Sequence, residues 1–486
     1  MPERDTIPLL VAGEWAAGPA PLEVRSPYDG TAAGRTSYAS DEQVEQAVSA
    51  AWGCRQEAAA LPLHARADAL LEAGRRIAER AEEVAALITA ESGKPVTWAR
   101  AEAGRAVSVF RWAAEETRRW SGEAMRLDTE RAAEGRFAYV RRVPKGPVLA
   151  ISPFNFPLNL AAHKVAPAIA IGAPVVLKPA PKTPLSALLM GRVLNEVMSE
   201  HGLPAGMLSV LNVENDRASA LVTDPRLPVV SFTGSGPVGH AIAAAVPDKH
   251  VVLELGGNAA VVVCDDYDRP GDLEHAAARI AAFATYQAGQ SCISVQRVYA
   301  TAPVYDGLRD ALEKAMAGLR SGDPRDPDTH VGPMIDEAAA RRVEEWVGEA
   351  AAAGAGVLVG GERAGTTYPP TLLEGVPEDA KVMCEEVFGP VLAIERVGST
   401  AEAFDRVNAS RYGLQAGVFT HDIGTAFRAH RDLEVGGVVV GDVPSYRADQ
   451  MPYGGTKESG VGREGVRYTM TDLTYERVMV LTGLDL

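Results

Sequence analysis

Cysteine and positive charge are both scarce in this sequence. Only four cysteines occur among 486 residues, Cys54, Cys264, Cys292 and Cys384, and no two are spaced like metal ligands. Four cysteines in so long a chain do not make a disulfide framework either, so we expect reduced thiols and no metal site. Lysines and arginines number 48 against 64 aspartates and glutamates, a formal net charge of −16. This balance argues against nucleic acid or an anionic membrane as the main partner.

Long apolar runs are also missing. The longest run, residues 165–177, falls short of the ~20 residues that a membrane helix needs, and it contains two prolines and a glycine. The N-terminus has an acidic start, a short apolar stretch and a proline, which is not the pattern of a signal peptide. We therefore predict a cytoplasmic protein without a membrane partner.

The length and the order of the patterns predict the fold class. A single hydrophobic core seldom grows beyond roughly 250–300 residues, so this chain should form two or more domains. Residues 41–117 favour helices with a break at 93–95, and residues 137–151 favour extended chain. Short β-branched runs then alternate with amphipathic helices in two successive series. Such alternation is typical of parallel sheets and predicts two α/β domains.

A glycine-rich turn suggests a nucleotide site. Gly234–Gly239 fits the pattern G-x-G-x-x-G, follows an expected strand and opens an expected helix. Glycines let a phosphate approach the backbone, and the helix N-terminus attracts its charge. A simple tight turn is the alternative. Glu254 lies about 20 residues further on, where the dinucleotide pattern places an acid that binds a ribose.

Two further segments place reactive side chains beside small residues. Glu254 ends an expected strand just before Gly256 and Gly257, a position that also suits a general base. Cys292 lies in a loop of small residues, which leaves a sulfur accessible near free backbone N–H groups. Each has an ordinary alternative: a solvated loop acid for Glu254, and a small buried hydrophobe for Cys292.

Taken together, these segments resemble the aldehyde dehydrogenase superfamily. The resemblance spans nearly the whole chain, and the motifs occur in the family's order. The motifs are Pro153–Pro157, Leu177–Pro179, Phe232–Ser235, Glu254–Gly257, Gly289–Cys292, Glu386–Pro390, and Pro452–Gly455 with Lys457–Gly460. The stretch PFNFPLNLAAHK and the pair Tyr446-Arg447 look closer to the branch of lactaldehyde and non-phosphorylating glyceraldehyde-3-phosphate dehydrogenases.

The resemblance implies NAD(P)-dependent oxidation of an aldehyde to an acid. Cys292 would attack the aldehyde carbon, and Asn155 would donate to the resulting oxyanion together with the Cys292 backbone N–H. Loss of hydride would leave a thioester on Cys292. Glu254 would then activate the water that hydrolyses it. This implied role makes Glu254 a base rather than a ribose ligand, so the G-x-G-x-x-G match is partly accidental.

The resemblance also implies contacts to NAD or NADP. The implied residues are Phe154, Lys178, Gly234, Ser235, Glu386 and Phe388. Ser235 would touch the pyrophosphate, Lys178 the adenosine ribose and Glu386 the nicotinamide ribose. Surface salt bridges for the two charged residues and core packing for Phe388 are the ordinary alternatives.

Two departures from family patterns bear on specificity. NAD-preferring relatives often carry a glutamate at the position of Pro181, which would repel the 2′-phosphate of NADP. Here that repulsion is gone and Lys182 adds a cation, so we expect both cofactors to be used. Relatives acting on succinic semialdehyde often have arginine where this chain has His163. Arg447 could meet a substrate anion bidentately, or form a structural salt bridge. These residues leave the identity of the physiological aldehyde open.

The expected domains follow from the same resemblance. Residues 1–124 and 145–256 would bind NAD(P), and residues 257–465 would form the catalytic domain. Residues 125–144 and 466–486 would form a small β element for oligomerisation. The apolar, β-branched tail is an edge-strand liability unless another subunit covers it, so we expect a homodimer or homotetramer built by sheet extension.

Two rival functions share the expected fold. A CoA-acylating aldehyde dehydrogenase has the same fold but usually lacks a hydrolytic base, so the presence of Glu254 argues against it. A catalytically silent structural or binding protein is the other rival. The joint retention of Cys292, Asn155, Glu254 and Glu386 argues against that interpretation.

Overall fold

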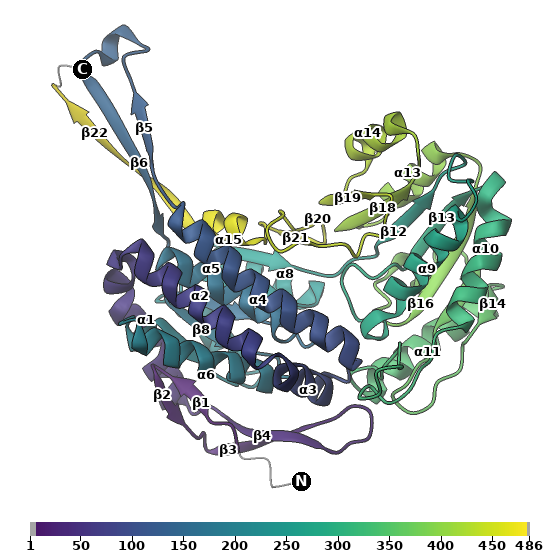
Figure 1. Cartoon of the computed structure of the whole chain (residues 1–486), viewed down its shortest axis with the longest axis horizontal. Helices are drawn as coiled ribbons and strands as arrows, with labels where there is room; N and C mark the ends of the chain where they lie inside the picture. The colour runs from purple at the N-terminus through teal and green to yellow at the C-terminus, as the bar shows by residue number, and fades with distance from the viewer. Residues whose placement is uncertain (1–5, 484–486) are drawn as a thin grey trace.

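Two α/β halves lie side by side, and a β-arm projects from the first half (Figure 1). The structure, a computed structural model, describes residues 6–483. The outermost residues of the expected cofactor domain, 1–5, and of the expected oligomerisation element, 484–486, lie outside the described residues. Within the described range, no helix is both long and apolar enough to cross a membrane.

The first half is built on an eight-stranded sheet in the order β2-β1-β9-β8-β7-β10-β11-β21. The five strands from β9 to β11 run parallel, and the pairings outside them are antiparallel. The strands are β1 (Leu9–Val11), β2 (Glu14–Ala16), β7 (Val148–Ile151), β8 (Val175–Lys178), β9 (Leu208–Val210), β10 (Val229–Thr233), β11 (His250–Glu254) and β21 (Gly460–Val461).

Helices surround this sheet and share one continuous apolar core with it. They are α1 (Asp41–Ala60), α2 (Leu63–Glu79), α3 (Ala81–Ser92), α4 (Val96–Arg118), α5 (Asn159–Ile171), α6 (Leu185–Glu200), α7 (Ala218–Thr223), α8 (Gly236–Ala245) and α15 (Val466–Asp472). The break predicted at 93–95 separates α3 from α4, where Gly93 has a left-handed backbone with φ of 71°.

The second half is built on a seven-stranded sheet in the order β14-β15-β16-β13-β12-β18-β19. Every pairing is parallel except that of β14 with β15. In β12, Val261 and Val263 point into one core while Ala260 and Val262 point into another, so this sheet is buried on both faces. The strands are β12 (Ala260–Val263), β13 (Arg297–Thr301), β14 (Gly356–Val359), β15 (Thr371–Glu374), β16 (Val391–Val397), β18 (Gln415–Phe419) and β19 (Gly437–Val440).

Among the described residues, six α-helices accompany the second sheet. They are α9 (Asp272–Thr285), α10 (Ala302–Ala317), α11 (Glu337–Ala352), α12 (Lys381–Cys384), α13 (Thr400–Asn408) and α14 (Ile423–Asp432). In the part of the chain that the structure describes, two small two-stranded sheets lie outside the arm. One pairs β3 (Ala20–Arg25) with β4 (Ala32–Tyr38), and the other pairs β17 (Tyr412–Gly413) with β20 (Thr456–Lys457).

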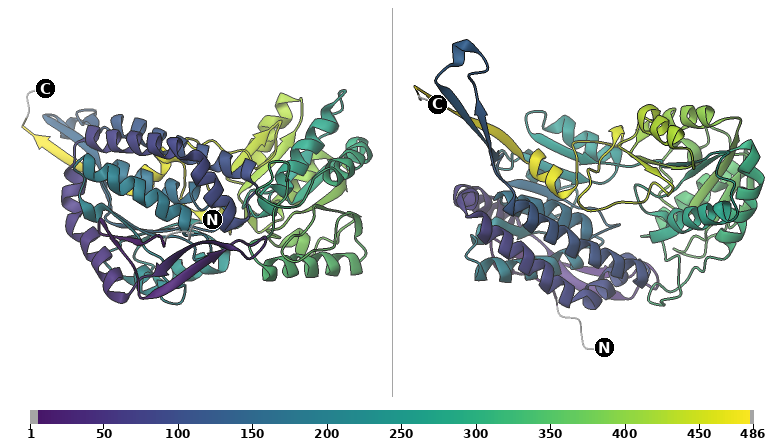
Figure 2. Two further views of the ribbon diagram at one scale, coloured as in Figure 1. Left: turned by 60° about the horizontal axis from the view of Figure 1, so that its bottom comes forward. Right: turned by 45° about the horizontal axis from the view of Figure 1, so that its top comes forward.

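The arm is a three-stranded antiparallel sheet in the order β22-β6-β5. It consists of β5 (Glu123–Arg126), β6 (Arg136–Pro144) and β22 (Thr474–Thr482), and β22 pairs with β6 along its whole length. The arm stands away from both halves in Figure 1 and in the right view of Figure 2. Eight of the nine residues of β22 are exposed, among them Val478 and Met479.

The predicted fold class is confirmed: two α/β halves with parallel sheets and a small β element. The domain boundaries stay a prediction. β21 lies within the segment assigned to the catalytic domain, yet it pairs with β11 of the first sheet. The small β element begins with β5, slightly before the predicted start at residue 125.

Candidate active site

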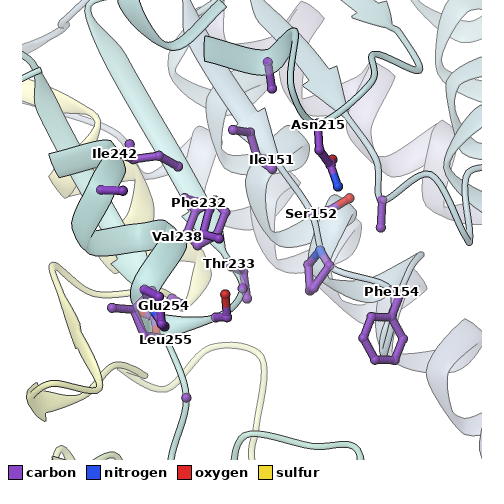
Figure 3. Close-up of a pocket in the computed structure, with 18 of the residues that line it drawn as sticks. Ile151, Ser152, Phe154, Asn215, Phe232, Thr233, Val238, Ile242, Glu254 and Leu255 are labelled. Atoms are coloured by element: carbon purple, nitrogen blue, oxygen red, sulfur yellow. The ribbon is translucent and has the colours of Figure 1, made fainter. Parts of the chain in front are cut away.

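A cavity of about 910 Å³ lies where the two halves meet. The first half lines it at the carboxyl ends of its parallel strands, with Ser152 after β7, Lys178 of β8, Gly234 after β10 and Glu254 of β11. Figure 3 shows Phe154 on one side and Val238 and Ile242 of α8 on the other. Carboxyl ends of parallel strands are the usual ligand-binding edge of an α/β sheet.

Cys292 enters this cavity from the second half, on the loop that follows α9. Gln287 and Ala288 adopt left-handed backbone there, with φ of 53° and 54°. Cys292 is half-buried, and its Sγ lies 2.8 Å from the Tyr453 hydroxyl. Burial raises the pKa of the thiol to about 12, and the hydrogen bond with Tyr453 opposes that shift.

Asn155 reaches the same loop from the first half. Its Nδ2 donates to the Gln290 carbonyl at 2.9 Å, and its Oδ1 accepts from the Phe156 N–H at 3.1 Å. The Asn155 amide carries a second N–H, and its side chain lines the cavity together with Cys292. The structure therefore places both residues of the expected oxyanion site together.

Glu254 ends β11 as a buried carboxyl in the cavity wall. Within residues 6–483, neither of its carboxyl oxygens has a hydrogen-bond partner. Burial raises its pKa well above the ordinary value, and the charge of Glu464 adds to the shift. Position 454 must stay small, because a Cβ at Gly454 would lie 3.0 Å from Glu254 Oε1.

Glu386 lines the cavity from the second half. Its Oε1 accepts from the Gly257 N–H at 2.9 Å, and burial raises its pKa to about 7. Gln296 binds the backbone on both sides of Glu386. Its Nε2 donates to the Glu385 carbonyl at 2.6 Å, and its Oε1 accepts from the Val387 N–H at 3.0 Å. The sequence motifs do not indicate this role of Gln296.

Phe388 and Phe154 close the cavity from opposite halves. Both line it, and their rings meet edge to face with centroids 5.9 Å apart. Phe388 has left-handed backbone, with φ of 47°, a conformation that costs a non-glycine residue about 1–3 kcal/mol. Such strain clusters at ligand sites. The loop that carries Phe388 also packs closely against the loop that carries Cys292. A Cβ added at Gly289 would lie only 2.0 Å from the Gly389 carbonyl oxygen.

Lys178, Pro181 and Ser235 also line the cavity. The Lys178 Nζ donates to Asn215 Oδ1 at 3.0 Å, and burial lowers its pKa to about 8. Ser235 is the N-cap residue of α8. The expectation for Lys182 needs correction: it pairs with Asp336 and, in the described part of the chain, is not a lining residue. Its partner Asp336 is the N-cap residue of α11, outside the cavity lining.

The two residues expected to contact the substrate, His163 and Arg447, make buried contacts with other side chains. His163 is fully buried in α5, where its Nε2 lies 3.2 Å from Asp449 Oδ1, and burial lowers its pKa to about 4. Arg447 donates to Glu464 at 3.0 Å, and its guanidinium lies 3.8 Å above the ring of Tyr453. Among the described residues, neither lines the large cavity, so the direct substrate contact expected of His163 is not supported.

A buried ion cluster behind Glu254 escaped the sequence analysis. Glu464 accepts from Lys164 at 3.1 Å and from Arg447 at 3.0 Å. Burial opposes ionisation of Glu464, but Lys164 and Arg447 overcome it and lower its pKa to about 2. Lys164 and Glu464 lie 300 residues apart in the chain, so no local pattern could have paired them.

The comparisons with known proteins define the class of protein. The family model described as Aldehyde dehydrogenase family matches residues 15–479. A 3-sulfolactaldehyde dehydrogenase of Priestia aryabhattai is 40% identical over 97% of each chain. The crystal structure of aldehyde dehydrogenase 21 from Physcomitrella patens, in complex with its reaction product succinate, superimposes with a TM-score of 0.96 at 41% identity, covering 99% of each chain.

A third comparison includes the cofactor. The crystal structure of an NADP-dependent glyceraldehyde-3-phosphate dehydrogenase from Bacillus halodurans, complexed with NADP, has a TM-score of 0.93 at 35% identity and covers 99% of this chain and 100% of that one. The chain belongs to the aldehyde dehydrogenase family. It is an NAD(P)-dependent enzyme that oxidises an aldehyde to an acid, and the predicted family and branch are confirmed.

Proposed function

We propose that this enzyme works through a thioester on Cys292, with Glu254 as the hydrolytic base. The observation that carries the proposal is the shared cavity, into which two halves of the chain bring Cys292, Asn155 and Glu254. Formation of a covalent intermediate divides a difficult oxidation into two easier steps.

In the first step the Cys292 sulfur bonds to the aldehyde carbon, and the carbonyl oxygen becomes an oxyanion. The free N–H of Asn155 and the Cys292 backbone N–H are the donors to that oxygen. Removing one such donor typically costs roughly 10²–10³-fold in rate. NAD(P), when bound, supplies the acceptor for the hydride that leaves this carbon.

In the second step a water oxygen attacks the thioester carbon. Glu254 accepts the proton of that water, the carbon–sulfur bond breaks, and the sulfur leaves as a thiolate. Because Glu254 lacks a hydrogen-bond partner in the described residues, its carboxyl oxygens are available to such a water. This base distinguishes hydrolysis from transfer to CoA, and the intact site argues against a silent protein.

The cavity fits a dinucleotide cofactor. Its volume is within the range of cofactor pockets, roughly 300–1,000 Å³. The N-terminus of α8 at Ser235 and the adjacent Gly234 suit a pyrophosphate, and Lys178 with Pro181 suits the adenosine end. Glu386, Phe388 and Phe154 would hold the nicotinamide end near Cys292.

The substrate, we propose, is a small aldehyde that carries an anionic group. Among the described residues Arg447 does not line the cavity and pairs with Glu464, but it lies over Tyr453, whose hydroxyl contacts Cys292, so its charge is one ring away from the nucleophile. Arg105 of α4 adds a partly exposed cation, which Asp449 holds at 3.0 Å. The similar proteins are named for a sulfonated aldehyde or a phosphorylated one, or bind succinate.

An aldehyde panel tests both parts of the proposal. Aldehydes with and without a carboxylate, sulfonate or phosphate are compared by reduction of NAD and NADP, first by the native enzyme and then by Cys292→Ala. We expect anionic aldehydes to have at least tenfold higher kcat/KM and the variant to be inactive. Equal use of neutral aldehydes would refute the anionic substrate, and turnover by Cys292→Ala would refute the thioester.

We also propose a homodimer or homotetramer in the cytoplasm. β22 is an unpaired edge of nine residues with a largely exposed apolar row. Such an edge invites aggregation unless a second copy covers it.

A further inference from the structure

The nucleophile has a specific hydrogen-bond partner. Tyr453 Oη lies 2.8 Å from Cys292 Sγ, and within residues 6–483 no other side chain makes a hydrogen bond to this sulfur. Tyr453 is buried and packs with Ile293 and Leu414 in a small apolar cluster against Cys292. The phenol thus meets the sulfur beside a small apolar cluster, where Cys292 lines the cavity.

The tyrosine is fixed in this position. Its backbone N–H donates to the Glu464 carbonyl at 2.9 Å, and its own carbonyl accepts from the Glu464 N–H at 2.6 Å. The Arg447 guanidinium lies 3.8 Å above the ring centroid, and Glu464 holds that guanidinium. Backbone pairing and a cation on the ring face together prevent the phenol from turning away.

The surroundings of Cys292 disfavour a thiolate. Burial is the largest cause, and the carboxyls of Glu386 and Glu254 act in the same direction. Arg447 and the Tyr453 hydroxyl act in the opposite direction. Burial also raises the pKa of Tyr453 well above its ordinary value, so the phenol keeps its proton and is a donor to an ionised sulfur.

We propose that Tyr453 is a further catalytic residue, whose hydroxyl donates a hydrogen bond to the Cys292 thiolate before attack and again when the sulfur leaves. The proposal rests on Cys292 being the nucleophile. When the carbon–sulfur bond forms, the sulfur loses its charge and the hydrogen bond weakens. When water has attacked and that bond breaks, the electron pair returns to sulfur and Tyr453 stabilises it. The phenolic proton stays on Tyr453 throughout.

The test is the pH dependence of Cys292 alkylation by iodoacetamide, measured in the native protein and in Tyr453→Phe. Alkylation is followed on the Cys292 peptide by mass spectrometry, because the chain has three other cysteines, of which Cys384 is exposed. Hydrogen bonds to charged groups are strong enough to shift a pKa by about one unit, which changes the thiolate fraction tenfold. A more basic thiolate is also about threefold more nucleophilic, so below the midpoint we expect roughly threefold slower alkylation.

The matched control is Tyr286→Phe. This buried phenol donates to Ser291, the neighbour of Cys292, and not to the nucleophile itself. Its removal should leave the alkylation profile in place, whereas Tyr453→Phe should move the profile toward higher pH. An unmoved or lowered profile in Tyr453→Phe would overturn the proposal, as would an equal shift in both variants.

A second measurement avoids the risk that Tyr453→Phe folds poorly. Replacement of the tyrosines by 3-fluorotyrosine makes each phenol more acidic and a stronger donor, so the profile should move toward lower pH. A profile that does not move contradicts the proposal. Failure of the thioester mechanism would be seen separately, as turnover by Cys292→Ala, and does not depend on either profile.

Discussion

At the scale of single residues, we propose that Lys178 and Pro181, at the expected adenosine end of the cavity, determine cofactor choice. Pro181 lines it without a charge, next to the buried Lys178. Lys182 pairs with Asp336 instead, so Lys178 is the lysine that we propose attracts a 2′-phosphate. We propose that both NAD and NADP are used, mainly because position 181 carries no negative charge to repel that phosphate.

We predict that NAD and NADP differ less than about a hundredfold in kcat/KM, a gap of roughly 2.7 kcal/mol. Pro181→Glu should shift the preference toward NAD, mostly through a higher KM for NADP. Pro181→Gln is the matched control, because it has the same size without the charge. Complete inactivity of the native enzyme with NADP at saturating aldehyde would contradict the argument.

Residue patterns predicted part of this site. Cys292, Asn155 and Glu254 occur in short motifs that match a family, and the structure brings all three to one cavity. A motif does not show which way a long side chain points. The motifs therefore predict ligand contacts for Lys182 and His163, whereas in the structure Lys182 pairs with Asp336 and His163 lies against Asp449. Tyr453 and Gln296 were missed because their contacts come from segments about 90 or more residues away.

At the scale of elements, the helix that follows Asn155 depends on a buried ion pair. Glu102 of α4 accepts from the N–H groups of Leu158 and Asn159, at 3.0 and 3.1 Å, where α5 begins. The same carboxylate pairs with the fully buried Lys94. Glu102 thus joins two helices just behind the loop that carries Asn155.

Glu102→Ala should lower the free energy of unfolding by about 3–5 kcal/mol, because it leaves a buried lysine and two backbone N–H groups without partners. Urea denaturation followed by circular dichroism measures this loss. The control is Glu82→Ala, which removes an exposed pair with Arg100 and should hardly change the urea midpoint. Similar midpoints for both variants would show that Glu102 contributes no more than a surface charge.

Sequence periodicity predicted most elements but not all of them. The amphipathic pattern predicts helices at residues 184–200 and 336–353, and α6 (Leu185–Glu200) and α11 (Glu337–Ala352) occupy those segments. The same pattern predicts no strand at the positions of β12, β15 and β18. Fully buried strands are short continuous apolar runs without alternation, and periodicity alone does not separate them from other buried segments.

At the scale of the whole molecule, the projecting arm is the surface through which we propose that subunits of the homodimer or homotetramer meet. Val478 and Val480 of β22 are 59% and 47% exposed on an unpaired edge. The double variant Val478→Glu, Val480→Glu should yield a smaller species in sedimentation velocity, because a subunit contact would bury two unpaired charges. Val357→Glu, on the edge strand β14, is the control and should leave the sedimentation coefficient unchanged. A native protein that sediments as a monomer at micromolar concentration would contradict the proposal.

The most direct test of the account is the intact mass of Glu254→Gln after it is mixed with aldehyde and NAD(P). Glutamine cannot accept the proton of the attacking water, so hydrolysis should slow by roughly 10²–10⁴-fold while the first step proceeds. We predict one reduced cofactor per site and a mass increase equal to the acyl group less the thiol hydrogen that it replaces, located on the Cys292 peptide. Steady turnover at the native rate, or an acyl group on any other residue, would contradict the account.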